Sequence, residues 1–254
     1  MDAYTGFARV YDRFMEDVPY GEWKEYLVKI LRQEGIMDGL VCELGCGTGK
    51  MTRLLAECGY DLIGIDASEE MLSAAREQPC AGILYVAQDM REFELYGTVR
   101  AVISVCDSMN YILEDEDLLK VFRLVNNYLD PGGIFIFDLN TIYKFKEEMG
   151  ERTFSEHHEE GSLVWDNYYD EDDRINEYEL TLYIRETDDL YRRYTETHYE
   201  RGYELQEVIC LLAQAGLKYS GAYDADDHGP VRDDSSRIYV VARENGKNSG
   251  SNRI

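Results

Sequence analysis

Three glycines, Gly45, Gly47 and Gly49, are separated by single residues. They lie where an apolar, strand-like run ends and a segment with helical periodicity begins. Glycine permits a tight turn and lets the backbone approach a ligand closely, and the free amides at the start of a helix attract negative charge. Glu43 lies just before this turn, and its carboxylate would repel a pyrophosphate but could accept hydrogen bonds from an ammonium group. The loop therefore favours a ligand that presents an ammonium group over one that presents a pyrophosphate.

Two acidic residues follow at the ends of the next two predicted strands. Asp66 lies at the end of the second strand, where a carboxylate can bind both hydroxyls of a ribose, a requirement that nicotinamide and adenosyl ligands share. Asp89 ends the third strand and can accept from an adenine amino group, while Met71 and Met90 offer apolar faces to the ring. Either acid alone would more often be a helix cap or a solvated strand end. Together with the glycine turn they indicate a nucleoside-binding pocket.

The elements that must position these residues alternate between short apolar runs and segments of helical period. This alternation is typical of an α/β fold, here a doubly wound, seven-stranded, mostly parallel sheet with helices on both faces. Thr48 and Ser68 are predicted N-caps of the first two crossover helices. Strands are predicted at 40–44, 61–66, 84–87, 101–106, 134–138, 217–223 and 237–243, and later helices at 118–129 and 204–215.

The segment 151–203 interrupts this pattern, because it is rich in Tyr and alternates with a period of two. Four antiparallel strands are predicted in it, which would form a β cap inserted into the core and facing the substrate. The chain is thus expected to divide into an N-terminal helical lid, a core in two pieces, the cap and a disordered tail. These parts are placed at 1–35, at 36–150 and 204–245, at 151–203, and at 246–254, with cap strands at 153–158, 162–170, 175–185 and 189–201.

Composition restricts the partners. The 254 residues include 26 basic and 51 acidic side chains, and a formal charge of −25 would repel nucleic acid. The apolar runs are shorter than the roughly 20 residues of a membrane span, and the N-terminus lacks an export signal, so a cytoplasmic protein is expected. The six Cys form no C-x-x-C pair, which argues against a disulfide framework or a metal site.

The motifs E-L-G-C-G-T-G, G-I-D-A-S-E-E-M-L and Q-D-M-R-E-F resemble the successive motifs of class I S-adenosylmethionine-dependent methyltransferases, over about residues 38–140. This resemblance implies a Rossmann-like fold and S-adenosylmethionine as cofactor. The implied contacts are Glu43, Gly45, Cys46, Gly47, Thr48 and Gly49 at the methionine part, Asp66, Ala67 and Met71 in the second motif at the ribose and adenine, Gln88, Asp89 and Met90 at the adenine, and Cys106 and Asp107 beside the sulfonium.

Two further segments, YTGFARVYDRFMEDVPYGEW and ETHYERGYELQE, resemble a bacterial subgroup of uncharacterised methyltransferases. The cap is similar to those of sugar-amine and glycine N-methyltransferases. The resemblance implies methyl transfer to nitrogen or oxygen of a small polar acceptor, by a monomer or a homodimer.

Methyl transfer needs few catalytic side chains, because the sulfonium already activates the methyl carbon. Aromatic faces suit a cationic sulfur, so Tyr20 and Trp23 are candidate cofactor contacts, Tyr111 a candidate wall at the sulfur and Tyr11 a candidate catalytic residue, although aromatic residues at helical spacing more often belong to a core. His198, at the end of the predicted cap, is the candidate base, its alternative being a hydrogen-bonded structural role. Arg201 could bind a carboxylate or phosphate of the acceptor, or form an ion pair with a neighbouring Glu.

Three alternatives remain at this point. An NAD-dependent oxidoreductase on the same fold is disfavoured by Glu43 and by Lys50, which occupies the position of a third fingerprint glycine. A non-catalytic S-adenosylmethionine-binding module would bind the cofactor but lack an acceptor pocket. A nucleic-acid methyltransferase is disfavoured because no basic cluster exceeds residues 191–194.

Overall fold

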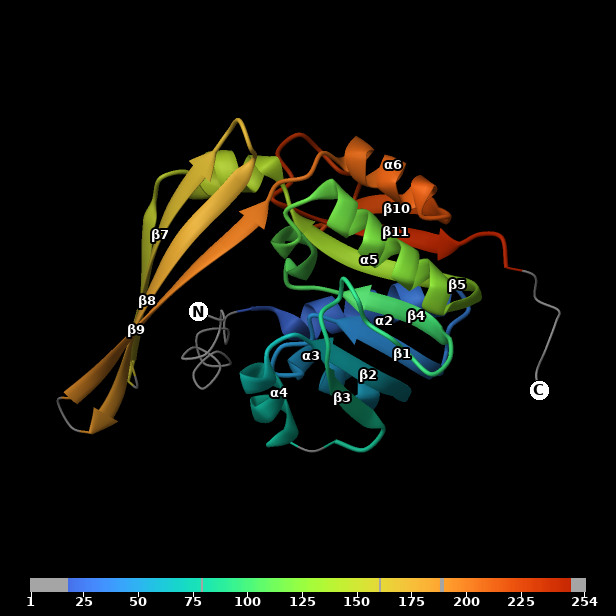
Figure 1. Cartoon of the computed structure of the whole chain (residues 1–254), viewed down its shortest axis with the longest axis horizontal. Coiled ribbons are helices and arrows are strands. Elements are labelled where there is room, and N and C mark those ends of the chain that lie inside the picture. Colours follow the sequence, from blue (N-terminus) through green and yellow to red (C-terminus); the bar gives the residue numbers. More distant parts are fainter. Residues whose placement is uncertain (1–17, 79, 160, 188–189, 248–254) are drawn as a thin grey trace.

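The computed structural model describes residues 18–247 apart from 79, 160, 188 and 189. It contains a seven-stranded sheet covered by helices and a separate four-stranded antiparallel sheet, which projects from one end of the larger sheet (Figure 1). The strand order of the larger sheet is β10-β11-β5-β4-β1-β2-β3. Only β11 runs antiparallel to its neighbours. The predicted doubly wound, mostly parallel sheet and the inserted antiparallel cap are confirmed.

The strands of the larger sheet are β1 (Gly39–Leu44), β2 (Tyr60–Asp66), β3 (Ile83–Ala87), β4 (Val99–Ser104), β5 (Leu129–Asn140), β10 (Leu217–Asp224) and β11 (Arg237–Glu244). The α-helices are α2 (Tyr20–Gln33), α3 (Lys50–Glu57), α4 (Glu69–Arg76), α5 (Asp115–Tyr128) and α6 (Leu205–Gln214). A short 3-10 helix, η1 (Ser108–Tyr111), follows β4, and a π-helical segment, η2 (Lys144–Met149), follows β5.

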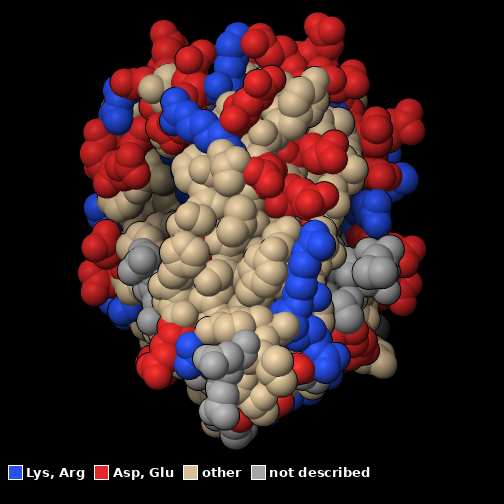
Figure 2. Space-filling view, turned by 90° about the vertical axis from the view of Figure 1, so that its left-hand side faces the viewer, with Lys and Arg blue, Asp and Glu red and all other residues tan. Residues whose placement is uncertain are grey.

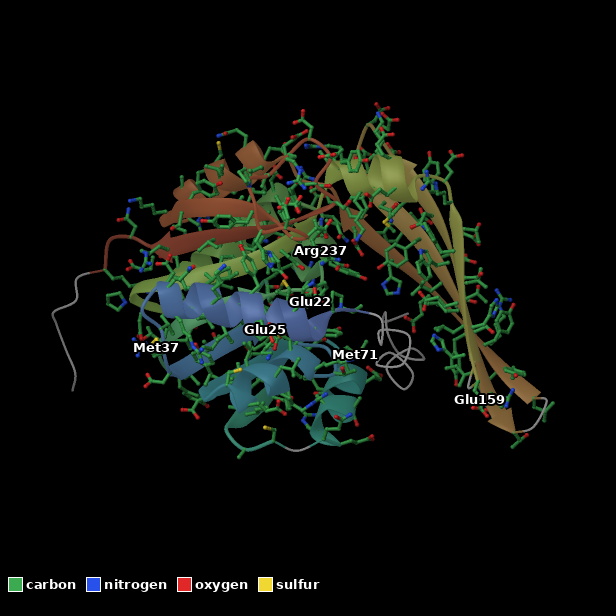
Figure 3. The ribbon with its side chains drawn as sticks, turned by 180° about the vertical axis from the view of Figure 1, so that it is seen from behind. Glu22, Glu25, Met37, Met71, Glu159 and Arg237 are labelled. Atoms are coloured by element: carbon green, nitrogen blue, oxygen red, sulfur yellow. The ribbon has the colours of Figure 1, made fainter. Side chains whose placement is uncertain are left out.

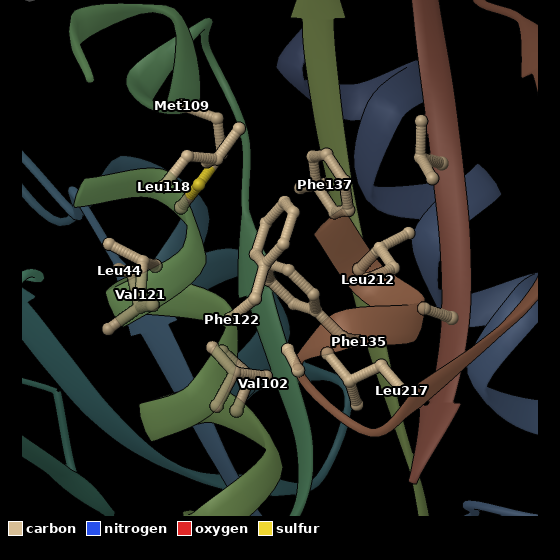
Figure 4. Close-up of a cluster of buried hydrophobic side chains, with 14 of the residues drawn as sticks. Leu44, Val102, Met109, Leu118, Val121, Phe122, Phe135, Phe137, Leu212 and Leu217 are labelled. Atoms are coloured by element: carbon tan, nitrogen blue, oxygen red, sulfur yellow. The ribbon is translucent and has the colours of Figure 1, made fainter. Parts of the chain in front are cut away.

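The hydrophobic core forms two layers, one on each face of the sheet. Helices α5 and α6 pack on one face, where Phe135 stacks on Phe137 and Phe122 packs against both (Figure 4). Helices α2 and α3 cover the other face. Burial of each large apolar side chain contributes about 1.5–3 kcal/mol. These two layers hold the sheet rigidly, so that the loops at the strand ends have fixed positions.

The N-terminal helix α2 belongs to this core. Its residues Tyr26, Leu27 and Leu31 are buried against the sheet together with Met51 and Leu55 of α3. The other residues of the predicted lid, 1–17, lie outside the described part of the chain, as do 248–254 of the predicted tail. The lid therefore remains a prediction.

The cap consists of β6 (Thr153–His158), β7 (Gly161–Asp170), β8 (Ile175–Thr187) and β9 (Leu190–Arg201), paired in sequence order. Side chains alternate between its faces. Leu163, Leu180 and Leu182 are buried on the side toward the core, whereas Tyr168 and Tyr183 are exposed on the other side. Figure 2 shows the end of the molecule that the cap occupies, where uncharged side chains fill the middle and acidic ones gather around them.

Two local details differ from the predictions. Helix α3 begins at Lys50, and its N-cap position is occupied by Gly49, in the left-handed conformation (φ 73°), rather than by Thr48. Strand β5 begins at Leu129 rather than 134, because the predicted turn is a bulge within the strand, with Gly132 at φ 73° and a register shift against β4. Among the described helices, none combines the length and apolar character that a membrane span requires.

Candidate functional site

The site lies at the carboxyl ends of β1 and β4, which are neighbours in the sheet although their crossover connections lead to opposite faces. In open α/β sheets, ligands bind at such a switch point. The amides of Gly45 and Cys46 both donate to the carbonyl of Ile65 at the end of β2 (2.8 and 3.0 Å). Gly45 has a φ of 70°, and a Cβ there would come within 2.6 Å of Ser108 Cβ. Position 45 of the turn therefore has no space for a larger residue.

Asp66 joins this turn to the next helix. Its Oδ2 accepts from the Gly47 amide and its Oδ1 from the Ser68 amide, both at 2.8 Å. Burial raises the pKa of Asp66, although these backbone donors act in the opposite direction. The carboxylate keeps further lone pairs for a ligand. Ser68 itself caps α4 by accepting from the Met71 amide (3.2 Å), as predicted.

A cavity of about 250 Å³, here called the cofactor cavity, lies in front of these residues. Met71, which forms one wall, is labelled in Figure 3. The structure brings together nine of the predicted cofactor residues around this cavity: Gly45, Gly47, Asp66, Ala67, Met71, Gln88, Asp89, Met90 and Cys106. Tyr111, a predicted aromatic wall at the sulfonium, also lines this cavity. Four lining residues were not among the predicted contacts, namely Ile65, Arg91, Ser108 and Ile112.

Asp89 and Arg91, which follow β3 and line the cofactor cavity, form an ion pair. The guanidinium of Arg91 binds both oxygens of Asp89, with Nε at 2.9 and 3.0 Å, and lowers the pKa of that carboxyl. Gln88 accepts from the Glu94 amide at 2.7 Å. Gln88 and Asp89, two of the predicted adenine contacts, are therefore already held in place by protein groups.

A smaller cavity adjoins the glycine turn on the other side and is lined by Tyr20, Glu43, Cys46, Thr48 and further residues of the turn. Glu43 is buried and accepts from the Thr52 hydroxyl, and its burial raises the pKa to about 8. The Lys50 ammonium lies 4.6 Å from the centre of the Tyr20 ring. Gly49 lines neither cavity.

The chain after β4 is held in an unusual conformation. Cys106 and Asp107 both have positive φ (60° and 55°), and their amides donate to the buried carboxylate of Asp138 at 3.1 and 2.8 Å. Arg237, labelled in Figure 3, binds Asp138 at 2.6 Å and Asp107 at 2.7 Å. Although burial alone would raise it, the charges of Arg237 and Lys144 hold the pKa of Asp107 below its ordinary value. Burial raises the pKa of Asp138 above the ordinary value of an aspartate side chain.

A second, larger cavity of about 660 Å³ lies between the cap and the core and is here called the cap cavity. Cys106 and Tyr111 line both this cavity and the cofactor cavity, so the two adjoin there. The cap contributes apolar walls such as Leu163, Trp165 and Leu180. The charged and polar lining residues are Asp107, Asn140, Lys144, Glu148, Glu156, His198, Glu200, Asp226, Ser236 and Arg237.

Four of the polar groups in this cavity are linked to one another. Tyr178 donates to Glu200 at 2.8 Å, the hydroxyls of Tyr178 and Tyr111 lie 2.6 Å apart, and Tyr111 lies 3.2 Å from His198 Nδ1. The His198 ring stacks on Tyr178, with ring centres 5.0 Å apart. Glu196 Oε2 lies 3.4 Å from the other ring nitrogen of His198.

The remaining candidates have different positions. Trp23, predicted at the cofactor, lines the cap cavity, where its ring faces Arg237 at 5.2 Å. Arg201 binds Asp115 and the Leu113 carbonyl, both at 2.9 Å, and thus forms an ion pair, although its partner is an Asp of α5 and not the predicted neighbouring Glu. Tyr11 lies outside the described residues.

Comparisons with known proteins agree with this arrangement. A family profile described as "Methyltransferase domain" matches residues 41–133. YqeM of Bacillus subtilis (strain 168), whose name places it among the methyltransferases, is 34% identical over 245 residues, which cover 95% of this chain and 97% of YqeM. A dTDP-3-amino-3,4,6-trideoxy-alpha-D-glucopyranose N,N-dimethyltransferase of Streptomyces venezuelae is 28% identical over 137 residues, 52% of this chain and 56% of its own.

The fold has a solved counterpart. The crystal structure of an S-adenosylmethionine-dependent methyltransferase from Clostridium acetobutylicum ATCC 824 superposes with a TM-score of 0.83 at 27% identity, and the match covers 96% of this chain and all of that one. The sheet order, the two adjoining cavities and these full-length matches lead to one conclusion. The chain belongs to the S-adenosylmethionine-dependent methyltransferases, and S-adenosylmethionine is its cofactor.

Proposed function

We propose that the protein transfers the methyl group of S-adenosylmethionine to a nitrogen or oxygen atom of a small polar acceptor bound in the cap cavity. The observation that carries this proposal is the meeting of the two cavities at Cys106 and Tyr111. A methyl acceptor must approach the sulfonium in line, and an acceptor in the cap cavity would reach the cofactor cavity at that border. Membership of the methyltransferase family leaves no support for the NAD-dependent alternative.

Bound S-adenosylmethionine supplies a methyl carbon already activated by its sulfonium. We assign the glycine turn to the amino-acid end of the cofactor and Asp66 to its ribose. Glu43 would accept from the ammonium group, and this contact would favour its ionised form, against the effect of burial. Tyr20, next to Cys106, would place its aromatic ring near the sulfonium.

The charges around the cap cavity favour nitrogen as the methylated atom. More acidic than basic side chains line this cavity, and a cationic amine would therefore be attracted to it. The name of the Streptomyces venezuelae relative also specifies an N,N-dimethyltransferase. The acidic residues are Asp107, Glu148, Glu156, Glu200 and Asp226, and the basic ones are Lys144 and Arg237.

His198 is proposed to contribute to proton transfer through its contact with Tyr111. We expect His198→Ala to slow methyl transfer by about 10²-fold, since a proton-transfer group contributes roughly that much or more. Calorimetry should show unchanged affinity for S-adenosylmethionine, because His198 does not line the cofactor cavity. His157→Ala, at an exposed position in β6, is the matched control. Equal rates for the two variants would end this assignment. Tyr11 stays a catalytic candidate from the sequence.

The proposal is tested by incubating the protein with labelled S-adenosylmethionine and an extract of small cell metabolites, followed by mass spectrometry. We expect a labelled product from a small amine, and none from added DNA or RNA. Cofactor binding without any product would favour the non-catalytic binding module. Fractionation of a cell and size-exclusion chromatography would test the predicted cytoplasmic location and the predicted monomer or homodimer.

A further inference from the structure

Four side chains of the cap cavity form a single hydrogen-bonded row: Glu200, Tyr178, Tyr111 and His198. Tyr111 belongs to the core, at the end of η1, and the other three lie on β8 and β9 of the cap. Tyr111 also lines the cofactor cavity, whereas Glu200 does not. The row therefore has one hydroxyl, that of Tyr111, at the border of the two cavities, and it leads from there through Tyr178 to a buried carboxyl group.

The number of protons fixes the direction of the hydrogen bonds in this row, because each tyrosine hydroxyl has one proton to donate. When Glu200 is ionised, Tyr178 donates to it, so Tyr111 donates to Tyr178 and His198 Nδ1 donates to Tyr111. When Glu200 is protonated, a chain that keeps the same contacts runs in the opposite direction and ends on His198 Nδ1. The two arrangements differ at both ends of the row, because in the second one Glu200 has gained a proton and His198 Nδ1 no longer carries the proton that it donated to Tyr111.

We propose that Glu200 receives, through Tyr178 and Tyr111, the proton that the acceptor gives up on methylation; this assignment rests on the proposed function. The acceptor atom forms a bond to the methyl carbon as the carbon–sulfur bond breaks, and the electron pair of that bond stays on sulfur. The proton of the methylated atom passes to the Tyr111 oxygen, the Tyr111 proton to Tyr178, and the Tyr178 proton to Glu200. Release of the proton from the neutral carboxyl to water restores the row.

The surroundings of Glu200 suit this role. Its residue is only 2% exposed, and burial, followed by the charge of Asp107, raises the pKa of its carboxyl to about 8. It can therefore bind and release a proton close to neutral pH. Burial raises the pKa of Tyr111 further from this range, so its hydroxyl stays neutral and relays the proton. Around Glu200 stand Tyr178 of β8, Asn140 of β5, Lys144 of η2, Asp107 after β4, Arg237 of β11 and His198 of β9.

Infrared difference spectroscopy tests the row without any acceptor. Because burial also raises the pKa of Glu43 to about 8, all the proteins compared carry Glu43→Gln. We expect the carbonyl stretch of a buried, protonated carboxyl that disappears as the pH is raised through about 8, and that is absent when Glu200→Gln is added. Because Tyr178 donates to the carboxylate and so lowers its pKa, Tyr178→Phe should move the titration to higher pH. Tyr183→Phe, on the exposed face of the same strand, is the control and should leave it unchanged. A signal that survives the addition of Glu200→Gln, or that Tyr178→Phe does not move, would overturn the relay.

Turnover with the metabolite extract gives the second test. We expect Glu200→Gln and Tyr178→Phe each to slow formation of S-adenosylhomocysteine by about 10²-fold, whereas Glu177→Gln on the exposed face of β8 does not. The rate of Glu200→Gln relative to the unaltered protein should fall as the pH is raised from about 6 to 9, because only the unaltered protein gains an ionised Glu200. A Glu200→Gln variant as fast as Glu177→Gln would refute the relay. Absence of product with the unaltered protein would instead refute the proposed function, and the infrared titration would still decide whether the row exists.

Discussion

The two cavities are built in different ways. The cofactor cavity is made mainly of short consecutive segments after β1, β2 and β3, where backbone amides and glycines fix the geometry. The cap cavity draws its lining from residues spread between Val18 and Arg237, and its polar groups are held by side-chain contacts between distant elements. A cavity shaped by backbone amides and glycines tolerates few substitutions, so it continues to bind the same cofactor. A cavity formed by side chains from distant elements can bind a different acceptor after a single substitution.

Replacement of Arg237 should have the largest effect, because this residue neutralises two carboxylates at the border of the cavities. We expect Arg237→Leu to lower the free energy of unfolding by about 3–5 kcal/mol, as when one partner of a buried ion pair is removed. The loss should be greater at pH 8 than at pH 5, since protonation of Asp107 and Asp138 relieves the unpaired charge. Urea unfolding measures both effects.

Arg243→Leu is the matched control on the same strand. Arg243 pairs with Glu34, and both side chains are about one third exposed, so its loss should cost about 1 kcal/mol or less. Equal destabilisation by the two variants would mean that the charges at the border do not organise the cap cavity in the way described above.

Asp66→Ala tests the cofactor cavity, whose geometry is set mainly by backbone amides and glycines. The change removes the acceptor for the Gly47 and Ser68 amides and the proposed ribose contact. We expect the dissociation constant for S-adenosylmethionine to rise about 10²-fold, since hydrogen bonds to a charged group contribute about 1.5–3 kcal/mol. Calorimetry with Asp61→Ala, an exposed residue of the same strand, provides the control. Binding of NAD by the unaltered protein, without affinity for S-adenosylmethionine, would contradict the assignment of this cavity.

Glu43 tests the limits of this comparison, because its side-chain charge acts in the smaller cavity beside the backbone-built glycine turn. If the cofactor ammonium binds Glu43, binding releases a proton at pH values below about 8. The affinity for S-adenosylmethionine should then rise up to about tenfold per pH unit between about 6 and 8, and remain flat in Glu43→Gln. Glu57→Gln, exposed on α3, should keep the slope of the unaltered protein. The same slope in Glu43→Gln would place the ammonium elsewhere.

The difference in construction between the two cavities explains which site residues could be predicted from the sequence. Nine cofactor-cavity residues were predictable because each lies within a few positions of a strand end, where a glycine or acid has a local meaning. The Asp107–Asp138–Arg237 contacts join residues 107, 138 and 237, and no local pattern relates them. Glu200 looked like one acid among many, and only the structure shows that it is buried and bonded to Tyr178. Ser108 had no signal beyond its place after β4.

Arg91→Ala should have the smallest effect and defines the limit of the cofactor cavity. Arg91 lines this cavity and holds Asp89, but its side chain is 50% exposed, and exposed ion pairs contribute about 0.2–1 kcal/mol. We therefore expect the dissociation constant for S-adenosylmethionine to rise less than about sixfold. Arg76→Ala, whose exposed pair with Glu69 does not line the cavity, should leave it unchanged. An effect of Arg91→Ala as large as that of Asp66→Ala would show that an exposed side chain, and not only the glycine turn and its acids, determines cofactor affinity.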